Sequence, residues 1–312
     1  MELSLRSLGI KPKAVVISDY ELLSNYNTLS MEGMDLVREL ERLDRVKKVA
    51  STIKDFGITP SLESLFGEEL KALGLSKFDN KKDAAKVYAS FESDSRTIWQ
   101  RIWAWVQKFA DWVKSIVTGI DAKVSEADTI IKDMKENDKK FVLDDTKKAV
   151  FIKRADYDDN TAIISECYHK FETDKKRLMD TSSYRPSEGL GGFDKDLETV
   201  KKVLATEEER VVTERFNGIG AIIADLTVNN SNFIATSKAA KDVIASATSL
   251  VARNKDKQKI TFGEKDEVDG QLYIDGLSHL IKEAHQLISM ETLQHRHTID
   301  EANRVFKCMK AK

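Results

Sequence analysis

Residues 98–117 read IWQRIWAWVQKFADWVKSIV and contain all four tryptophans of the chain. Apolar residues recur here every three or four positions, which places them on one broad face of a helix. Trp103 lies within this face, and Trp105 and Trp112 lie along its edge. Arginines and lysines border the face, where their aliphatic stems cover apolar surface while their charges stay in water. The stretch therefore predicts a wide-faced amphipathic helix against which other parts of the chain pack.

Two interpretations of this face are open. It is the core side of a helix in an all-α protein, or it binds a membrane interface or the groove of a partner, because tryptophan beside lysine and arginine is also typical of interfacial helices. A membrane-spanning helix is excluded, since charges interrupt the stretch and about 18 apolar residues in a row are needed. The residues of this candidate partner- or membrane-binding face are Trp99, Ile102, Trp103, Trp105, Val106, Phe109, Trp112 and Val113.

The composition favours long helices with solvent-exposed charges. Of the 312 residues, 33% are charged and only three are proline, and the net charge is −2. This balance argues against a sequence-specific nucleic-acid binder, which usually gathers basic residues on one face. Cys167 and Cys308 do not make a disulfide framework, and we expect both to be reduced. The N-terminus lacks the pattern of a secretory signal, so we expect synthesis in a cytoplasm.

The apolar spacing runs without a breaker from about residue 81 to residue 136, which predicts one very long helix. Residues 260–274, with Gly263 and Asp269-Gly270 around a polar loop, predict a small β-hairpin. The fold class is therefore mainly α, an elongated helical bundle with one very long helix (about 81–136) and a small β-hairpin near 260–274. Further helices are expected over residues 34–56, 156–176, 194–215, 218–252 and 275–309, and residues 141–152 are ambiguous between helix and strand.

A proline, serines and three glycines in SSYRPSEGLGG, which begins at Ser182, indicate a linker. We therefore expect four parts along the chain. These are an N-terminal helical segment and candidate propeptide over 1–92, a long-helix domain over 93–181, the linker over 182–193, and a C-terminal helical domain with the hairpin over 194–312.

No catalytic, cofactor or metal-binding pattern stands out. His295 and His297 are two apart, which places them on different helical faces, whereas a helical zinc site uses a pair four apart. Cys167 and His169 are also two apart and cannot form a nucleophile–base pair on one helix. We therefore expect a non-enzymatic protein with no catalytic residues, no cofactor and no metal.

Four tripeptides share the form Ser-apolar-Glu. One interpretation is helix capping, because serine caps helix N-termini and glutamate favours the first turn. The tripeptides are Ser30-Met31-Glu32, Ser61-Leu62-Glu63, Ser90-Phe91-Glu92 and Ser289-Met290-Glu291.

The three tripeptides nearest the N-terminus resemble sites cut by the prohead maturation proteases of large tailed bacteriophages, of the T-even-like and jumbo phage type. The phrases LSMEGMDL and SLESLFGEEL, followed by the tryptophan-rich helix, are similar in style to the internal head proteins of these phages. The family's enzymes cleave after the glutamate, so the resemblance implies Glu32, Glu63 and Glu92 as candidate cleavage positions. Glu92 lies inside the long predicted helix, which favours Glu32 and Glu63.

The resemblance covers residues 30–117 and implies a structural protein of the virion interior. Its N-terminal piece would be a capsid-targeting propeptide, and its partners would be other virion proteins and a prohead protease, after synthesis in the host cytoplasm. The body of the chain lacks the positive excess of a DNA-condensing protein, so the expected contacts are with proteins.

Two alternatives from other classes are compatible with the same residues. One is a membrane-interacting, pore-forming-like all-α protein that acts through the tryptophan-rich helix. The other is a coiled-coil adaptor that stays in the cytoplasm. A helix with so wide an apolar face also suits a homo-oligomer.

Overall fold

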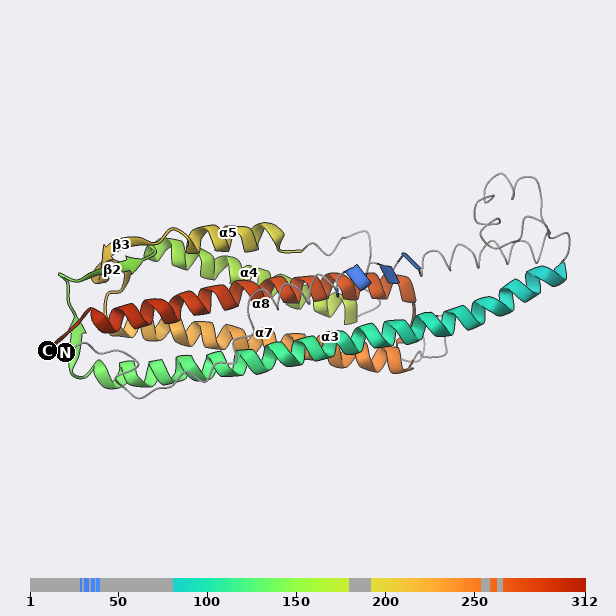
Figure 1. Cartoon of the computed structure of the whole chain (residues 1–312), viewed down its shortest axis with the longest axis horizontal. Helices are drawn as coiled ribbons and strands as arrows, with labels where there is room; N and C mark the ends of the chain where they lie inside the picture. Colours follow the sequence, from blue (N-terminus) through green and yellow to red (C-terminus); the bar gives the residue numbers. More distant parts are fainter. Residues whose placement is uncertain are drawn as a thin grey trace.

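A computed structural model describes residues 81–179, 192–253, 259–262 and 266–312, together with eight residues between Leu29 and Glu39. These eight, called here the N-terminal segment, are helical, and they are Leu29, Met31, Glu32, Gly33, Asp35, Leu36, Arg38 and Glu39. The described part is an elongated, mainly α-helical bundle (Figure 1). The predicted fold class is confirmed.

The longest element is α3 (Lys81–Asn137), a helix of 57 residues. At 1.5 Å per residue it is about 85 Å long. No proline interrupts it, and its apolar residues keep the helical spacing throughout. The long helix expected over about 81–136 is confirmed almost to the residue, and Figure 1 shows one end of α3 extending well beyond α7 and α8.

Four further helices run along the bundle. They are α4 (Arg154–Met179), α5 (Asp194–Leu204), α7 (Ile219–Arg253) and α8 (Gly270–Lys307). The packing order follows the contacts: α3 packs on α7, α7 on α8, and α8 on both α4 and α5. Figure 1 accordingly shows α8 between α4 and α5 on one side and α7 and α3 on the other. No helix in the described ranges has an apolar run long enough to cross a membrane.

Two short antiparallel strand pairs lie at the end of the bundle that also holds the C-terminus (Figure 1). β1 (Phe141–Leu143) pairs with β6 (Met309–Ala311), and β2 (Lys148–Phe151) pairs with β3 (Glu208–Val211). The four-residue helix α6 (Val212–Arg215) follows β3 directly. The residues left open between helix and strand therefore form two strands, each paired with a distant segment.

The single helix expected over residues 194–215 is wrong. Helix α5 ends at Leu204, and the chain then forms β3 and α6. The strand is held by pairing with β2, in which Val211 lies opposite Lys148, whereas the next two β-branched residues, Val212 and Thr213, already belong to α6. Pairing with a distant strand is not visible in local periodicity.

The predicted hairpin is present as β4 (Lys259–Phe262) and β5 (Asp266–Asp269), which connect α7 to α8. Its second strand is shorter than expected, because α8 already begins at Gly270. Tyr273, Leu277 and Leu280 are buried at three- or four-residue spacing, so this stretch continues the helical pattern rather than the strand.

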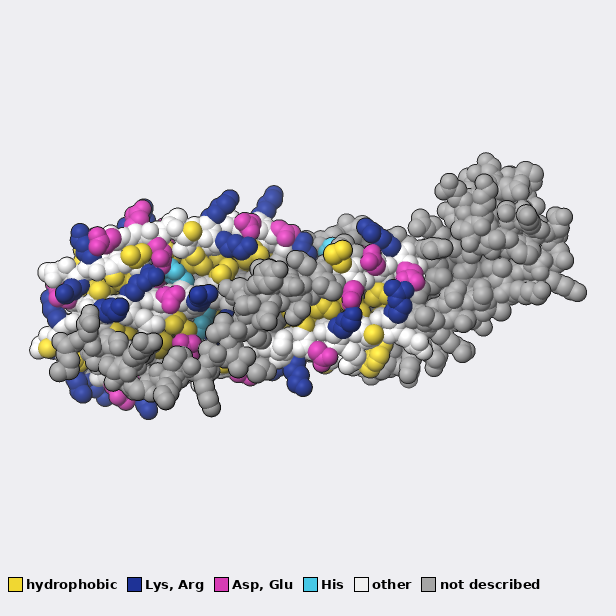
Figure 2. Space-filling view, in the orientation of Figure 1, with side chains coloured by type: hydrophobic (Ala, Val, Ile, Leu, Met, Phe, Trp, Pro, Cys, Tyr) yellow, Lys and Arg dark blue, Asp and Glu magenta, His cyan; other side chains and the backbone are white. Residues whose placement is uncertain are grey.

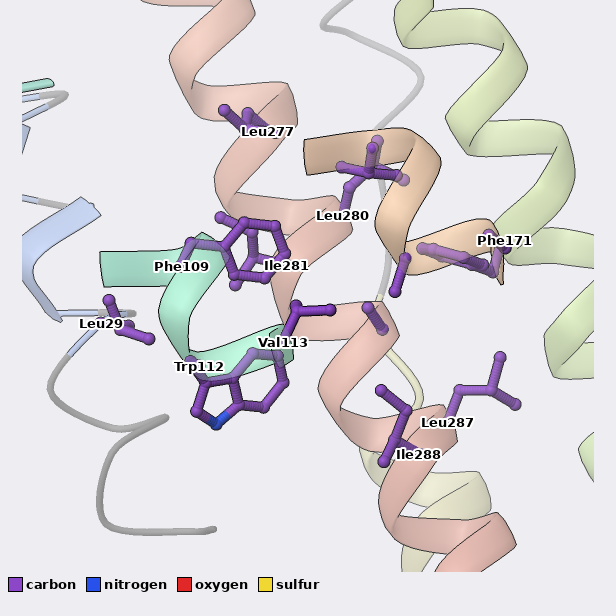
Figure 3. Close-up of a cluster of buried hydrophobic side chains, with 14 of the residues drawn as sticks. Leu29, Phe109, Trp112, Val113, Phe171, Leu277, Leu280, Ile281, Leu287 and Ile288 are labelled. Atoms are coloured by element: carbon purple, nitrogen blue, oxygen red, sulfur yellow. The ribbon is translucent and has the colours of Figure 1, made fainter. Parts of the chain in front are cut away.

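The core consists of two apolar clusters along the bundle. One joins α3, α4, α5, α7, α8 and the N-terminal segment, and includes Phe109, Phe171, Leu280 and Leu287 (Figure 3). The other lies at the strand-bearing end and includes Met134, Phe151, Phe216 and Phe306. Helices from both sides of the expected linker contribute to both clusters. Residues 180–191 lie outside the described part, and the division into domains stays a prediction.

Phe109→Ala should lower the free energy of unfolding by about 3–5 kcal/mol, because the ring is fully buried and its loss leaves a cavity. Denaturant unfolding followed by circular dichroism measures this change. Gln100→Ala, at an exposed position of the same helix, is the matched control and should have little effect. Equal effects of the two changes would contradict the assignment of Phe109 to the core.

Candidate docking site on the tryptophan helix

The predicted apolar face of α3 lies against the core. Trp105, placed at the edge of the face by the sequence, is 2% exposed, whereas Trp103, placed within the face, is only half-buried. The face is therefore rotated toward Trp105 and Trp112 relative to the expectation, because neighbours cover that edge. Its other buried members are Ile102, Val106, Phe109 and Val113, and the side chain of Trp99 lies outside the described residues.

Two neighbours cover the edge that holds Trp105. Leu29 and Leu36 of the N-terminal segment join the same apolar cluster as Trp105 and Phe109. From α8 the cluster includes Ile281, and Figure 3 shows Leu29 and Ile281 on either side of the α3 turn that carries Phe109. The candidate binding face and the segment that holds the first Ser-apolar-Glu tripeptide therefore meet at one place, which the sequence did not predict.

Directed polar contacts also hold the N-terminal segment. The indole N–H of Trp105 donates to the backbone oxygen of Leu29 at 2.9 Å, inside the protein. Lys108 Nζ lies 2.6 Å from Glu32 Oε1, and Arg101 pairs with Glu39. Both ion pairs are at the surface, where each contributes about 0–1 kcal/mol. The buried hydrogen bond and the leucines therefore provide most of the attachment.

Gly33 lets the segment approach α3 and α8 closely. A Cβ atom at this position would lie 2.9 Å from Ser278 Oγ and 2.9 Å from Trp105 Cζ2. Real Cβ atoms are not found at such distances, so a larger residue here requires the indole ring or the segment to move. Leu29, Gly33 and Leu36 form the i, i+4, i+7 stripe of a helix bound in a groove.

The candidate cleavage positions fall in different surroundings. Glu32 is half-buried and helical, and Gly33, on the other side of the expected cut, is buried. Glu92 lies within α3, Glu63 lies outside the described residues, and Glu291 is 4% exposed in the middle of α8. The fourth tripeptide is therefore part of the core.

A buried ionic network near the strand pairs was not predicted from the sequence. Arg215 is fully buried, and its Nη2 lies 3.1 Å from Asp225 Oδ2 and 2.9 Å from Glu301 Oε2. Arg154 Nη1 lies 3.0 Å from the same Asp225 carboxylate. The network thus ties α4, α6, α7 and α8 together. The available signal was Asp225 itself, the only charged residue between Arg215 and Lys238.

Aromatic rings cover both sides of Arg215. Its guanidinium carbon lies 4.2 Å from the centre of the Tyr157 ring and 4.3 Å from that of Phe216. The faces of the two rings attract the positive charge of the guanidinium, and this cation–π interaction partly replaces the water that the group loses on burial. The Tyr157 hydroxyl also lies 3.0 Å from Thr298 Oγ1, and Asn229 donates to both oxygens.

The network continues toward the surface through His297. Its Nε2 lies 3.3 Å from Glu301 Oε1, and its Nδ1 lies 3.4 Å from Glu207 Oε1. Arg304 contacts the same Glu207 oxygen at 2.6 Å and donates to the backbone oxygen of Val150. Helix α8 is thereby fastened to β2 and to the turn before β3.

Three further polar groups are buried along α8. His295 Nε2 lies 2.9 Å from Asn230 Oδ1, and burial lowers the pKa of His295 to about 4, so the ring is neutral. Thr236 donates to Glu291 at 2.7 Å, and burial raises the pKa of this carboxyl to about 8. Burial, and then the nearby Asp174, raise the pKa of Glu283 to about 8.

These polar groups do not form a metal site in the part of the chain that the structure describes. Among the described residues, no group of three His, Cys, Asp or Glu side chains is arranged to hold a metal ion. Both cysteines are free and buried, and burial raises the pKa of Cys167 to about 12, which keeps its thiol protonated. A pocket of about 400 Å³ lies beside Arg154, Arg215 and Asp225, whose charges already pair with one another.

Arg215→Met should lower the free energy of unfolding by about 3–5 kcal/mol, because Glu301 would remain buried without its arginine and Asp225 would keep only Arg154. Urea unfolding measures the change. Lys201→Met removes a solvent-exposed partner of Glu198 and should leave stability almost unchanged. A loss for Arg215→Met no larger than for this control would contradict a structural role of the network.

Glu291→Gln should stabilise the protein more at pH 8 than at pH 4.5. The folded chain binds the Glu291 proton more tightly than the unfolded chain, in which the carboxyl titrates near 4.5. The stability of the unchanged protein therefore falls, through this group, as pH rises from about 4.5 to about 8, by at most about 1.4 kcal/mol per pH unit. Unfolding curves over this range should diverge, and those of the exposed control Glu126→Gln should not.

Comparisons with known proteins add no relative. No family model matches the sequence, no curated protein matches it, and no solved structure matches the fold.

Proposed function

We propose that this chain is a non-enzymatic structural and interaction protein, packaged in the virion interior of a large tailed phage and processed after a Ser-apolar-Glu motif. Its partners are other virion proteins and a prohead protease. The proposal rests on the resemblance of residues 30–117 to internal head proteins and on the position of the N-terminal segment.

The supporting observation is that the segment is peripheral to the body. Of the buried residues in the two apolar clusters, only Leu29 and Leu36 come from it. All other members lie between Ile102 and Cys308. Among the described residues, a cut after Glu32 therefore removes Leu29 and its hydrogen bond to Trp105 and no other buried member of either cluster. A chain that loses an N-terminal propeptide during maturation needs a body of this kind.

The interior polar groups support a structural role for the body. Arg215 pairs with both Asp225 and Glu301, which joins three helices through charged contacts inside the protein.

The membrane alternative has less support from the structure. Trp105, Phe109 and Trp112 pack in the core, so α3 would have to separate from its neighbours before this face met a lipid surface. The adaptor alternative agrees with the extended α3 and differs from our proposal in requiring no processing.

Intact-mass measurement and N-terminal peptide mapping of the protein from its natural source test the proposal. We expect a mature N-terminus at Gly33, Ser64 or Ser93, directly after Glu32, Glu63 or Glu92. Glu32→Gln should block the first of these cuts, whereas Glu126→Gln, an exposed glutamate of α3, should block none. An uncut chain that begins at Met1 would contradict processing and favour a full-length interaction protein.

A further inference from the structure

We propose that the N-terminal segment docks reversibly in the groove between α3 and α8, and that this docking controls proteolytic access to the Glu32–Gly33 bond. The biological use of this control rests on the proposed function, but the docking itself does not. The ligand of the groove is the chain's own helical segment.

The docked geometry protects the bond. Proteases act on backbone that has opened away from regular structure, and Glu32 and Gly33 are both helical here. Gly33 is buried against Trp105 and Ser278, and the Glu32 carboxylate is paired with Lys108. A protease that recognises the glutamate and cleaves before the glycine therefore cannot bind either residue while the segment is docked. Cleavage requires the segment to leave the groove.

The attachment is weak enough to open locally. Among the described residues, it consists of two leucines, one buried hydrogen bond and two surface ion pairs, Lys108 with Glu32 and Arg101 with Glu39. The contacts between α3 and α7 and between α7 and α8 involve no residue of the segment. The segment can therefore separate without unfolding of the body.

The groove also specifies its occupant. It accepts a helix with a leucine, a glycine four residues later and a leucine three residues after that, because only glycine fits between Trp105 and Ser278. Lys108 and Arg101 lie where such a helix carries glutamates. Charge and shape thus both match residues 29–39.

The second Ser-Met-Glu tripeptide provides an internal control. Glu291 follows the same two residues as Glu32 but is 4% exposed in α8, between Thr236 and the rest of the core. It should be cut only after global unfolding. Glu32 should be cut through local opening, at a rate between that of Glu291 and that of an unprotected bond.

The experiment is limited proteolysis of the full-length chain with a glutamate-specific endopeptidase, with fragments identified by mass spectrometry. Cleavage after Glu32 should be at least tenfold slower in the folded chain than in a synthetic peptide of residues 25–40. Trp105→Phe, which removes the N–H donor together with part of the indole ring, should speed it about fivefold. Leu36→Ala should speed it about thirtyfold or more. Trp112→Phe is the matched control, because Trp112 Nε1 has no hydrogen-bond partner among the described residues, and it should change the rate less than twofold.

Equal rates in the folded chain and the peptide would overturn the proposal, as would equal effects of Trp105→Phe and Trp112→Phe. Circular dichroism of each variant shows whether the body remains folded. The endopeptidase is independent of any phage enzyme, so a protected Glu32 in a protein that is never processed in its source would refute the proposed function and leave the docking intact. Processing after Glu32 without protection would do the reverse.

Discussion

The arrangement of the whole bundle depends on the burial of the aromatic face of α3. A helix of 57 residues that carried Trp105 and Phe109 in water would lose about 2–3 kcal/mol of stabilisation for each exposed ring. Helix α7 covers much of this face, and it contributes alanines to the same cluster, among them Ala239, Ala240 and Ala247. Small side chains let two helices run close together over many turns. The charged surface in Figure 2 lies outside this contact, where lysine, arginine and acidic side chains alternate over the described elements.

Helix α8 differs from α3, because it is buried on almost all sides and several of its buried side chains are polar. Each of its neighbours supplies partners: Thr236 and Asn230 of α7 bond Glu291 and His295, and Arg215 of α6 pairs with Glu301. A buried polar group that loses its partner costs about 1–3 kcal/mol, and more when it is charged. A shift of α8 by one turn would remove all of these bonds at once. Apolar packing alone tolerates such shifts, so the polar contacts are what select one register of α8.

The difference between apolar patterns within one helix and contacts between distant segments explains which features were predictable from the sequence. The extent of α3 follows from a periodic apolar pattern without a breaker, which is local information, and the hairpin of β4 and β5 is likewise visible in the local sequence. The contact of Trp105 with Leu29 and the network of Arg215 join residues 76 and 86 positions apart and leave no local trace. The same limit explains the error in the rotation of the α3 face. Helical spacing predicts the burial of Trp103 and Trp105 from the apolar residues near them on the same helix. Their actual burial depends on which other segments cover each side of that helix.

The two Ser-Met-Glu tripeptides show why a short motif does not define a site. Both have identical residues, both are predicted to be helical or next to a helix, and by sequence neither differs from the other in chemistry. One lies in α8, where Glu291 accepts a hydrogen bond from Thr236 inside the core, and its removal from that position would disturb a packed interior. The other lies in a segment held by two leucines and by Trp105, at the edge of the same core. The free energy needed to expose each bond, rather than the tripeptide itself, therefore determines which of them an enzyme is able to cut.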